Sequence, residues 1–342
     1  MMSRLKTFII MLMSFGVFGV APSLTFAAEL NIYSYRKPQL LQPFLDAYAE
    51  KTGTEFNVVH APKGLVQRLQ AEGAASPADV ILTVDVSRLH ELASADLLAP
   101  LSSDIINNRI PAHLRDAEDK WTALSTRARI IAVSKDRVQD GAIKRIEDLT
   151  KPEWEGRICV RKGSHVYNRA LLASLVVHHG ADEAEKWAKG LVANLARKPQ
   201  GNDRAQAKAV YAGECDVAIM NTYYFGKMKF NKKNPEQRDW ANALKIVFLN
   251  QEDRGQHINI SGGGIVKTSP RADEARAFLE WMSSIDAQKI YASINYEYPA
   301  NKNVAADVEV ASWGKFKADD VSITDIAKAS SQAQMIINRV GW

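Results

Sequence analysis

The sequence is poor in cysteine, carries little net charge and, after its first 27 positions, contains no long apolar run. Its 44 Lys and Arg residues against 39 Asp and Glu residues give a net charge of only +5. No stretch combines closely spaced basic residues with interleaved aromatics, which a nucleic-acid-binding face requires. We therefore expect no nucleic-acid partner. A hydrophobic content of 46% and a charged content of 24% are instead typical of a soluble globular chain.

The common enzyme motifs are also absent. The sequence has no GxSxG nucleophile elbow, no P-loop, no HExxH and no GxGxxG after a predicted strand. Gly262-Gly263-Gly264 lacks the spacing and the following helix of a dinucleotide site, so we interpret it as a bend or a close approach of two backbones. No nucleophile forms a recognisable pair with a base. We expect a protein that is not an enzyme, and a secreted hydrolase is the alternative from a different class.

Residues 1–27 have the pattern of a secretory signal peptide. Two basic residues precede an uncharged apolar run over 8–20, and Thr25-Phe26-Ala27 places small residues at the cleavage positions. The run is short for a membrane span, and no later segment approaches the ~20 apolar residues that a spanning helix needs. We predict cleavage after Ala27 and export of a protein that does not itself span the membrane.

The two cysteines, Cys159 and Cys215, remain in the mature chain. In an oxidising compartment an even pair most often forms a disulfide. Two separate buried thiols are the alternative, because cysteine is often buried. Each cysteine is close in sequence to a tyrosine of interest, Cys159 to Tyr167 and Cys215 to Tyr223. A disulfide would therefore join the two tyrosine-bearing segments.

Strand and helix patterns alternate along the mature chain, which is typical of a parallel α/β sheet. A length of 342 residues exceeds one ordinary compact core, so we expect two lobes joined by crossing strands. Strands are expected at 29–34, 54–60, 77–84, 129–133, 157–160, 216–220, 244–249, 257–260 and 265–266. Helices are expected at 38–52, 65–72, 165–178, 181–195, 203–212, 271–283, 286–293 and 323–340, with a weak helical pattern at 225–230.

Four tyrosines lie just past predicted strand ends, where open α/β sheets bind their ligands. They are Tyr35, Tyr167 and the tandem pair Tyr223-Tyr224. A phenol with its usual pKa of about 10 is neutral at pH 7, but a highly charged cation favours the phenolate. Phenolate is a hard donor that suits ferric iron better than zinc or copper(I). Half-buried aromatics that only cover a sheet edge are the alternative for such a pair.

Charged and histidine residues offer partial support for a metal site. Arg127 and Arg129 lie on the predicted crossing strand, where one of them could balance excess phenolate charge; surface solvation or an ordinary ion pair is the alternative. His165 lies two residues before Tyr167 and could be a ligand or a hydrogen-bond donor behind the ligands. The pair His178-His179 precedes Gly180 at a predicted helix C-terminus, where histidine needs no metal to be favourable.

With these residues assembled, the chain resembles the periplasmic ferric-iron-binding proteins of ABC importers, of the iron-deficiency-induced type. The resemblance covers essentially the whole mature chain, and the tandem tyrosine with an upstream tyrosine is its most specific part. The segments that carry it are Asn31-Ile32-Tyr33-Ser34-Tyr35-Arg36, Pro77-Ala78-Asp79-Val80, Thr126-Arg127-Ala128-Arg129, Gly163-Ser164-His165-Val166-Tyr167-Asn168 and Asn221-Thr222-Tyr223-Tyr224.

The resemblance implies that Tyr167, Tyr223 and Tyr224 are iron ligands from the second lobe. Some family members place a His-Tyr pair just after the first strand, where this chain has Arg36-Lys37-Pro38. This departure leaves Tyr35 as the expected first-lobe ligand, with Tyr33 as the alternative.

Residues near these ligands are also singled out by the resemblance. One of Arg127 and Arg129 is expected to reach the site as a counter-charge, and His165 and Asn168 are candidates for the metal or for the residues behind it. Family members differ in whether a synergistic anion such as carbonate completes the coordination, and the sequence leaves this open.

The fold implied by the resemblance is the two-lobe periplasmic binding protein (type II) class, with a mainly parallel sheet flanked by helices in each lobe. We expect residues 28–126 plus about 250–300 in the N-terminal lobe and 127–249 plus about 301–342 in the C-terminal lobe. The implied function is capture of Fe(III) in the periplasm, by a monomer, for an ABC permease in the inner membrane. A binding protein of the same fold for an anion or a polyamine is the alternative.

Overall fold

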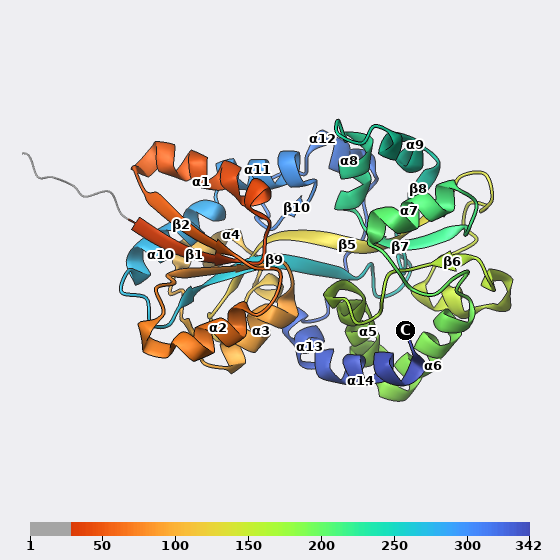
Figure 1. The fold of residues 1–342 in the computed structure, drawn as a ribbon, viewed down its shortest axis with the longest axis horizontal. Coiled ribbons are helices and arrows are strands. Elements are labelled where there is room, and N and C mark those ends of the chain that lie inside the picture. The colour runs from red at the N-terminus through yellow and green to blue at the C-terminus, as the bar shows by residue number, and fades with distance from the viewer. Residues whose placement is uncertain (1–28) are drawn as a thin grey trace, which may run out of the picture.

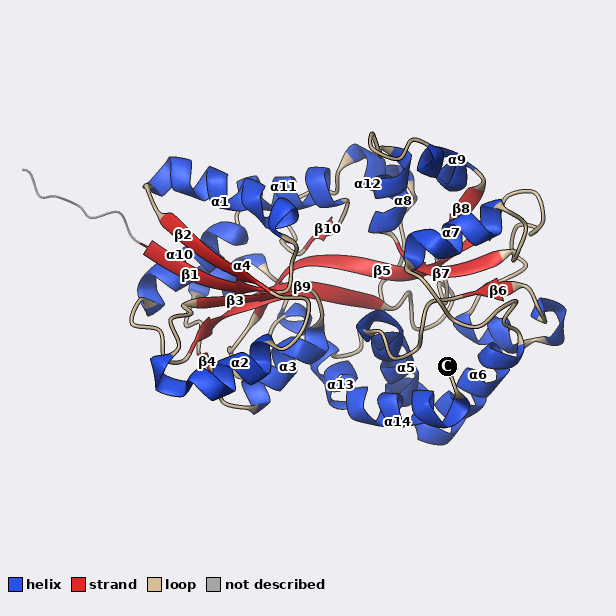
Figure 2. Ribbon diagram, viewed as in Figure 1, coloured by secondary structure: helices blue, strands red, loops and turns tan. Residues whose placement is uncertain are grey.

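The computed structural model describes residues 29–342, so the predicted signal peptide lies outside the described residues. Figures 1 and 2 show an elongated α/β molecule in which two long strands run between two groups of helices. The strands are β1 (Glu29–Ser34), β2 (Glu55–His60), β3 (Val80–Thr83), β4 (Leu98–Ala99), β5 (Thr122–Ser134), β6 (Ile158–Cys159), β7 (Val217–Asn221), β8 (Leu244–Val247), β9 (Ile258–Val266) and β10 (Tyr298–Pro299).

Helices cover the sheet on both sides (Figure 2). They are α1 (Pro38–Thr52), α2 (Leu65–Glu72), α3 (Val86–Ser94), α4 (Asp104–Arg109), α5 (Val166–His179), α6 (Ala181–Ala193), α7 (Asp203–Tyr211), α8 (Tyr223–Lys229), α9 (Glu236–Asn242), α10 (Ala272–Met282), α11 (Ile285–Asn295), α12 (Val308–Ser312), α13 (Ile323–Lys328) and α14 (Ser330–Val340). None of these helices in the described part of the chain combines the length and apolar character needed to cross a membrane.

Local signals explain where the first helix begins and ends. Pro38 occupies its first turn, where a missing backbone N–H costs nothing. Gly53 follows its last residue with a φ of 73°, a left-handed conformation that glycine adopts without a steric penalty. Its apolar face, which includes Phe44 and Tyr48, is buried. These sequence-based expectations are confirmed.

The sheet is mixed rather than mainly parallel. The strand order is β2-β1-β3-β9-β5-β7-β6. In addition, β4 pairs with β9, and both β8 and β10 pair with β5. The pairs β1–β2, β1–β3 and β6–β7 are parallel, whereas β9 and β5 run antiparallel to every strand beside them. The expectation of mainly parallel sheets was wrong in this respect, because the crossing strands return in the opposite direction.

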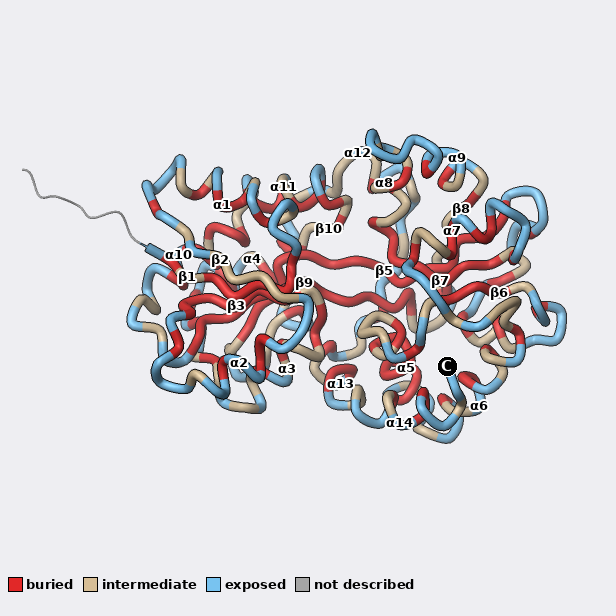
Figure 3. The backbone as a smooth tube through the Cα atoms, in the orientation of Figure 1, coloured by how far each residue is buried: buried red, intermediate tan, exposed pale blue. Residues whose placement is uncertain are grey.

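Strand β5 connects the two ends of the molecule. Its residues up to Ala128 pair with β9, and its residues from Arg129 onward pair with β7 and β8. All thirteen residues of β5 are buried, as Figure 3 shows along the middle of the molecule. The strand can therefore hold two groups of elements in register without a flexible linker. The residue ranges proposed for the two lobes stay a prediction.

Two expected elements are divided differently in the structure. The glycines at 262–264 lie inside one continuous strand, β9, so the predicted split of this strand was wrong. A Cβ at Gly264 would lie 2.8 Å from the carbonyl oxygen of Lys120, so the close backbone approach is confirmed. The helix expected over 323–340 is interrupted at Ala329, with ψ of −6°, because α13 packs on α3 and α5 whereas α14 follows α5 and α6.

Candidate metal centre

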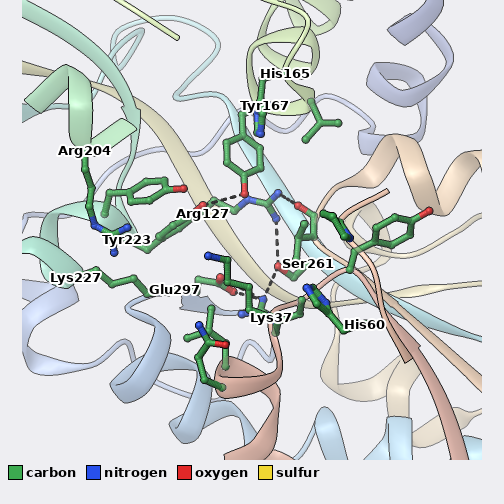
Figure 4. Close-up of a pocket in the computed structure, with 18 of the residues that line it drawn as sticks. Lys37, His60, Arg127, His165, Tyr167, Arg204, Tyr223, Lys227, Ser261 and Glu297 are labelled. Carbon is green, nitrogen blue, oxygen red and sulfur yellow. Dashed lines mark hydrogen bonds and ion pairs between the residues drawn. The ribbon is translucent and has the colours of Figure 1, made fainter. Parts of the chain in front are cut away.

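A cavity of about 560 Å³ is lined by residues from the end of β1, the end of β2, the start of α5, helix α8 and strand β9. All four predicted tyrosines line this cavity, and Figure 4 shows Tyr167 and Tyr223 directed toward one another. The hydroxyl of Tyr223 donates to the hydroxyl of Tyr167 at 3.0 Å. The rings of Tyr223 and Tyr224 lie 4.5 Å apart between centroids. The structure thus brings together the three residues that the resemblance implies as ligands.

The two neighbouring tyrosines share one cavity because α8 begins directly at Tyr223, two residues earlier than the weak helical pattern indicated. Strand β7 ends at Asn221, and Thr222 alone separates it from the helix. Tyr167 is the second residue of α5, so its phenol lies at the positive end of a helix dipole, where an anion is favoured.

Without a cation the tyrosines are neutral at pH 7. Burial, with further contributions from Tyr167 and Tyr224, raises the pKa of Tyr223 well above its usual value, against a lowering effect of Arg127. Burial followed by the effect of Tyr167 raises the pKa of Tyr224 to about 12. These phenolates therefore form only when a cation replaces the protons.

Of the two candidate arginines, Arg127 lines the cavity. Its guanidinium carbon lies 5.6 Å from the centre of the Tyr167 ring. It donates to the carbonyl of Val84 and, at 3.5 Å, to the hydroxyl of Ser261. Figure 4 shows this guanidinium beside the Tyr167 hydroxyl, a position suited to a counter-charge.

Arg129 lies behind the cavity instead. It donates to Asn168 Oδ1 at 2.6 Å and to Asp203 Oδ2 at 2.6 Å, and neither Arg129 nor Asn168 lines the cavity. Asn168 in turn donates to the carbonyls of Arg161 and Lys162. Both predicted residues therefore hold the start of α5 against β5 rather than facing a ligand.

Asp203 is a positioning residue that the sequence analysis missed. Its fully buried carboxylate accepts from Arg129, from Arg161 at 3.0 Å and from the backbone N–H of Asn221 at 2.9 Å. The last bond fixes Asn221 at the end of β7, two residues before Tyr223. A carboxylate directly after Asn202 at a helix start was the only sequence signal, and there it is commonly a simple helix cap.

His165 lines the cavity as the cap of α5. Its Nδ1 accepts the backbone N–H of Tyr167 at 3.3 Å, and its ring packs edge-on against the Tyr167 ring at 4.5 Å. Burial and the nearby Arg161 lower the pKa of His165 to about 3, so the ring is neutral. The proton of this neutral ring is on Nε2, which makes it a donor toward the cavity.

The predicted first-lobe tyrosines are engaged elsewhere. Tyr35 lines the cavity, but its hydroxyl accepts the backbone N–H of Val66 at 3.2 Å at the start of α2. Tyr33 is not among the residues that line the cavity, and its hydroxyl donates to Glu72 at 2.7 Å. Burial and this carboxylate raise the pKa of Tyr33, which disfavours a phenolate. The structure does not bring either hydroxyl together with the other three tyrosines.

The cavity is strongly basic, which the sequence analysis did not predict. Its cationic side chains are Arg36, Lys37, Arg88, Arg127, Arg204, Lys227 and Lys233. Among the described residues that line it, Glu297 is the only acidic one, and it forms a buried ion pair with Arg36 at 3.0 Å. Burial, together with Arg36 and Arg204, lowers the pKa of Lys227 to about 8 despite the opposing effect of Glu297. The sequence did not reveal this basic lining because its seven residues come from segments that are far apart in the chain.

The disulfide prediction is confirmed. Cys159 and Cys215 are bonded although 56 positions separate them. The bond lies where β6 pairs with β7, so it joins the strand that leads to Tyr167 to the strand that leads to Tyr223. Within residues 29–342, no three His, Cys, Asp or Glu side chains are grouped as a metal site would require.

A model of the family described as bacterial extracellular solute-binding protein matches residues 75–321. The chain belongs to this family. Iron uptake protein A1 from Synechocystis is 39% identical to this solute-binding protein over 315 residues, which are 92% of the chain and 87% of that protein. Because this is a family of solute-binding proteins, membership of it confirms the expectation that the chain is not an enzyme.

Solved structures agree with this assignment. Ferric iron-binding protein A of Mannheimia haemolytica, in an open conformation, has a TM-score of 0.86 at 44% identity, covering 92% of this chain and 99% of that one. The Trichodesmium protein IdiA (FutA), in complex with iron and citrate, has a TM-score of 0.88 at 42% identity, covering 92% and 100%. The predicted α/β fold of a two-lobe solute-binding protein is thus confirmed.

Proposed function

We propose that this solute-binding protein captures Fe(III) in the periplasm and delivers it to an ABC permease in the inner membrane. The observation that carries the proposal is the convergence of Tyr167, Tyr223 and Tyr224 in one cavity, with the Tyr167 and Tyr223 hydroxyls 3.0 Å apart. Three phenolates neutralise a 3+ ion, and their hard oxygens match the preference of ferric iron. Relatives named as ferric iron-binding proteins support the choice of metal.

Each part of the cavity has a role in this proposal. The tyrosines of α5 and α8 bind the cation, and Arg127 balances negative charge beside them. Arg129 and Asp203 keep the two tyrosine-bearing segments in place. Closing of the lobes over the ion excludes water, and the ion favours closure only through contacts that the closed state adds.

An anion bound together with the iron is part of the proposal. Seven cationic side chains line the cavity against one carboxylate that is already paired. Carbonate or a small carboxylate would occupy coordination positions that the phenolates leave open and would be neutralised by these side chains. The citrate in the Trichodesmium complex supports an anion of this kind.

The same basic lining bears on the two alternative solutes. A polyamine would meet repulsion from these cations and would find only Glu297, which Arg36 already neutralises. A free anion, bound without iron, is compatible with the charge and is the second candidate function. It does not explain why three phenols gather at one point.

Metal titration of the mature protein tests the proposal. We expect one ferric ion per chain and a phenolate-to-iron charge-transfer colour, which citrate at low pH removes. The Tyr223→Phe/Tyr224→Phe variant should lose both while keeping its fold, because only hydroxyl groups are removed. Tyr211→Phe is the matched control, since Tyr211 is exposed and outside the cavity. A wild-type protein that takes up no iron and stays colourless would refute the proposal.

A further inference from the structure

His60, the last residue of β2, lines the same cavity as the tyrosines (Figure 4). Its Nδ1 lies 3.1 Å from the carbonyl oxygen of Ser34, its partner residue in the parallel register of β1 and β2. Because a carbonyl oxygen only accepts, Nδ1 must carry the proton of the neutral ring. The lone pair is then on Nε2, and this atom has no hydrogen-bond partner within the part of the chain that the structure describes.

The second histidine of the cavity has the opposite arrangement. Nδ1 of His165 accepts the N–H of Tyr167, so its Nε2 carries a proton and cannot bind a metal in the neutral ring. Of the two imidazoles that line the cavity, only His60 therefore offers a free lone pair.

The two tyrosines at the end of β1, whose oxygens could also be metal ligands, already have hydrogen-bond partners. The hydroxyl of Tyr35 accepts a backbone N–H from α2, and the hydroxyl of Tyr33 donates to Glu72. The ammonium group of Lys37, which also lines the cavity, has three N–H donors and no acceptor. His60 is thus the imidazole that offers a lone pair on the side of the cavity formed by β1 and β2.

We infer that Nε2 of His60 is a nitrogen ligand of the ferric ion held by Tyr167, Tyr223 and Tyr224; this inference rests on the proposed function. Imidazole is a suitable ligand for iron, and a ring whose Nδ1 donates to a carbonyl is the arrangement that orients metal-binding histidines. A neutral imidazole adds a ligand without adding charge to a site that three phenolates already neutralise. The bond also ties β2 to α5 and α8, which couples iron binding to closing of the cavity.

Pulsed electron paramagnetic resonance of the iron-loaded mature protein tests the inference directly. We expect coupling of Fe(III) to a histidine nitrogen in protein labelled with ¹⁵N-histidine. His60→Gln should lose this coupling, keep the phenolate charge-transfer colour and bind iron on the order of 10- to 100-fold more weakly in competition with citrate. The His90→Gln variant is the matched control, because His90 lies on α3 outside this cavity. It should keep both the coupling and the affinity.

A second variant guards against an effect on folding. His60→Ala should regain the nitrogen coupling when free imidazole is added, as expected for a ligand and not for a residue that only supports β2. Coloured, iron-loaded wild-type protein without nitrogen coupling, or a His60→Gln variant that keeps coupling and affinity, would overturn the role of His60 alone. A wild-type protein with neither colour nor iron would instead overturn the proposed function, so the two failures are distinguishable.

Discussion

The hydroxyl oxygens of Tyr167 and Tyr223 lie 3.0 Å apart, although 56 positions separate the two residues in the chain. Two phenolates at this distance would repel each other strongly in a buried site, and burial already raises the pKa of Tyr223. Tyr223 is therefore protonated in the iron-free protein. A cation must displace this proton to bind.

Proton release follows from this relationship. When ferric citrate is added at pH 7, we expect about three protons to leave per ion bound, one from each phenol. A pH indicator in weakly buffered solution measures the release, with the Tyr223→Phe/Tyr224→Phe variant as the control that should release almost none. Iron binding with full colour and no proton release would contradict the assignment of phenolate ligands.

The affinity for iron should fall steeply with pH for the same reason. Burial raises the pKa of Tyr223 and raises that of Tyr224 to about 12, so at neutral pH and below protons compete with the metal for these phenol oxygens. The logarithm of the apparent affinity should then drop by about three for each pH unit lost. Competition with a chelator between pH 5 and 8, corrected for the protons of the chelator itself, measures this slope. A slope near zero would exclude phenolate ligation.

The buried ion pair between Arg129 and Asp203 should control the stability of the C-terminal part of the fold. The two side chains meet at 2.6 Å and are almost fully buried. Removing one partner leaves an uncompensated buried charge, so Asp203→Ala should lower the free energy of unfolding by about 3–5 kcal/mol. Urea denaturation measures the loss. The exposed pair of Lys186 with Glu183 gives the control, because Lys186→Ala should change stability little.

The buried carboxylate of Asp203 should also make the stability of the protein depend on pH in the acid range. Burial alone would raise the pKa of Asp203, but the guanidinium groups of Arg129 and Arg161 hold it below its usual value. Its contribution to stability is therefore present above the unfolded-state pKa of about 3.9 and is lost as the pH falls below that value. Asp203→Asn should be less stable than wild type at pH 7, and the difference should shrink below pH 4. A difference that stays constant down to pH 2 would contradict this mechanism.

Much of this architecture could be predicted because its signals are local. Pro38 and Gly53 set the ends of α1, and the tyrosines follow apolar strand segments that periodicity identifies. The mixed sheet could not be predicted in this way, because the direction of β9 beside β5 depends on pairing between residues far apart in sequence. The three glycines of β9 gave the hint of a close contact without naming the partner strand.

The individual site residues show the same limit. The sequence analysis singled out Tyr35 and missed His60, and the roles of both residues depend on hydrogen bonds across the fold. The N–H of Val66 occupies the Tyr35 hydroxyl, and the carbonyl of Ser34 sets the tautomer of His60. Neither partner is visible in a pattern of residue types, since both are backbone atoms brought close by packing.

The disulfide should stabilise the tyrosine-bearing segments mainly by restricting the unfolded chain. Cys159 and Cys215 are separated by 56 positions, and a loop of that size is worth about 4 kcal/mol in the chain-entropy model. We expect Cys159→Ala/Cys215→Ala to lose roughly 2–4 kcal/mol in urea denaturation. A reductant should not change the stability of this variant, whereas it should lower the stability of the wild type. Equal stability of both proteins under oxidising conditions would show that the loop is already restricted by other contacts.

Gly226 in α8 sets how closely the tandem tyrosines approach the β10 segment. A Cβ at this position would lie 2.6 Å from Cγ of Tyr296. Tyr296 has a left-handed φ of 54° at the end of α11, and the next residue, Glu297, is fixed by its buried pair with Arg36. The ring therefore has little freedom to retreat.

Two effects oppose each other in Gly226→Ala. Alanine favours the helix by about 1 kcal/mol, but overpacking against a fixed ring costs about 1–3 kcal/mol. We expect a net loss of stability, with a shift of α8 that weakens iron binding through Tyr223 and Tyr224. In a Tyr296→Ala background the clash is gone, so the same substitution should become stabilising. Urea denaturation of the four proteins in this cycle measures the coupling, and an equal effect of Gly226→Ala in both backgrounds would show that the ring does not limit the packing of α8.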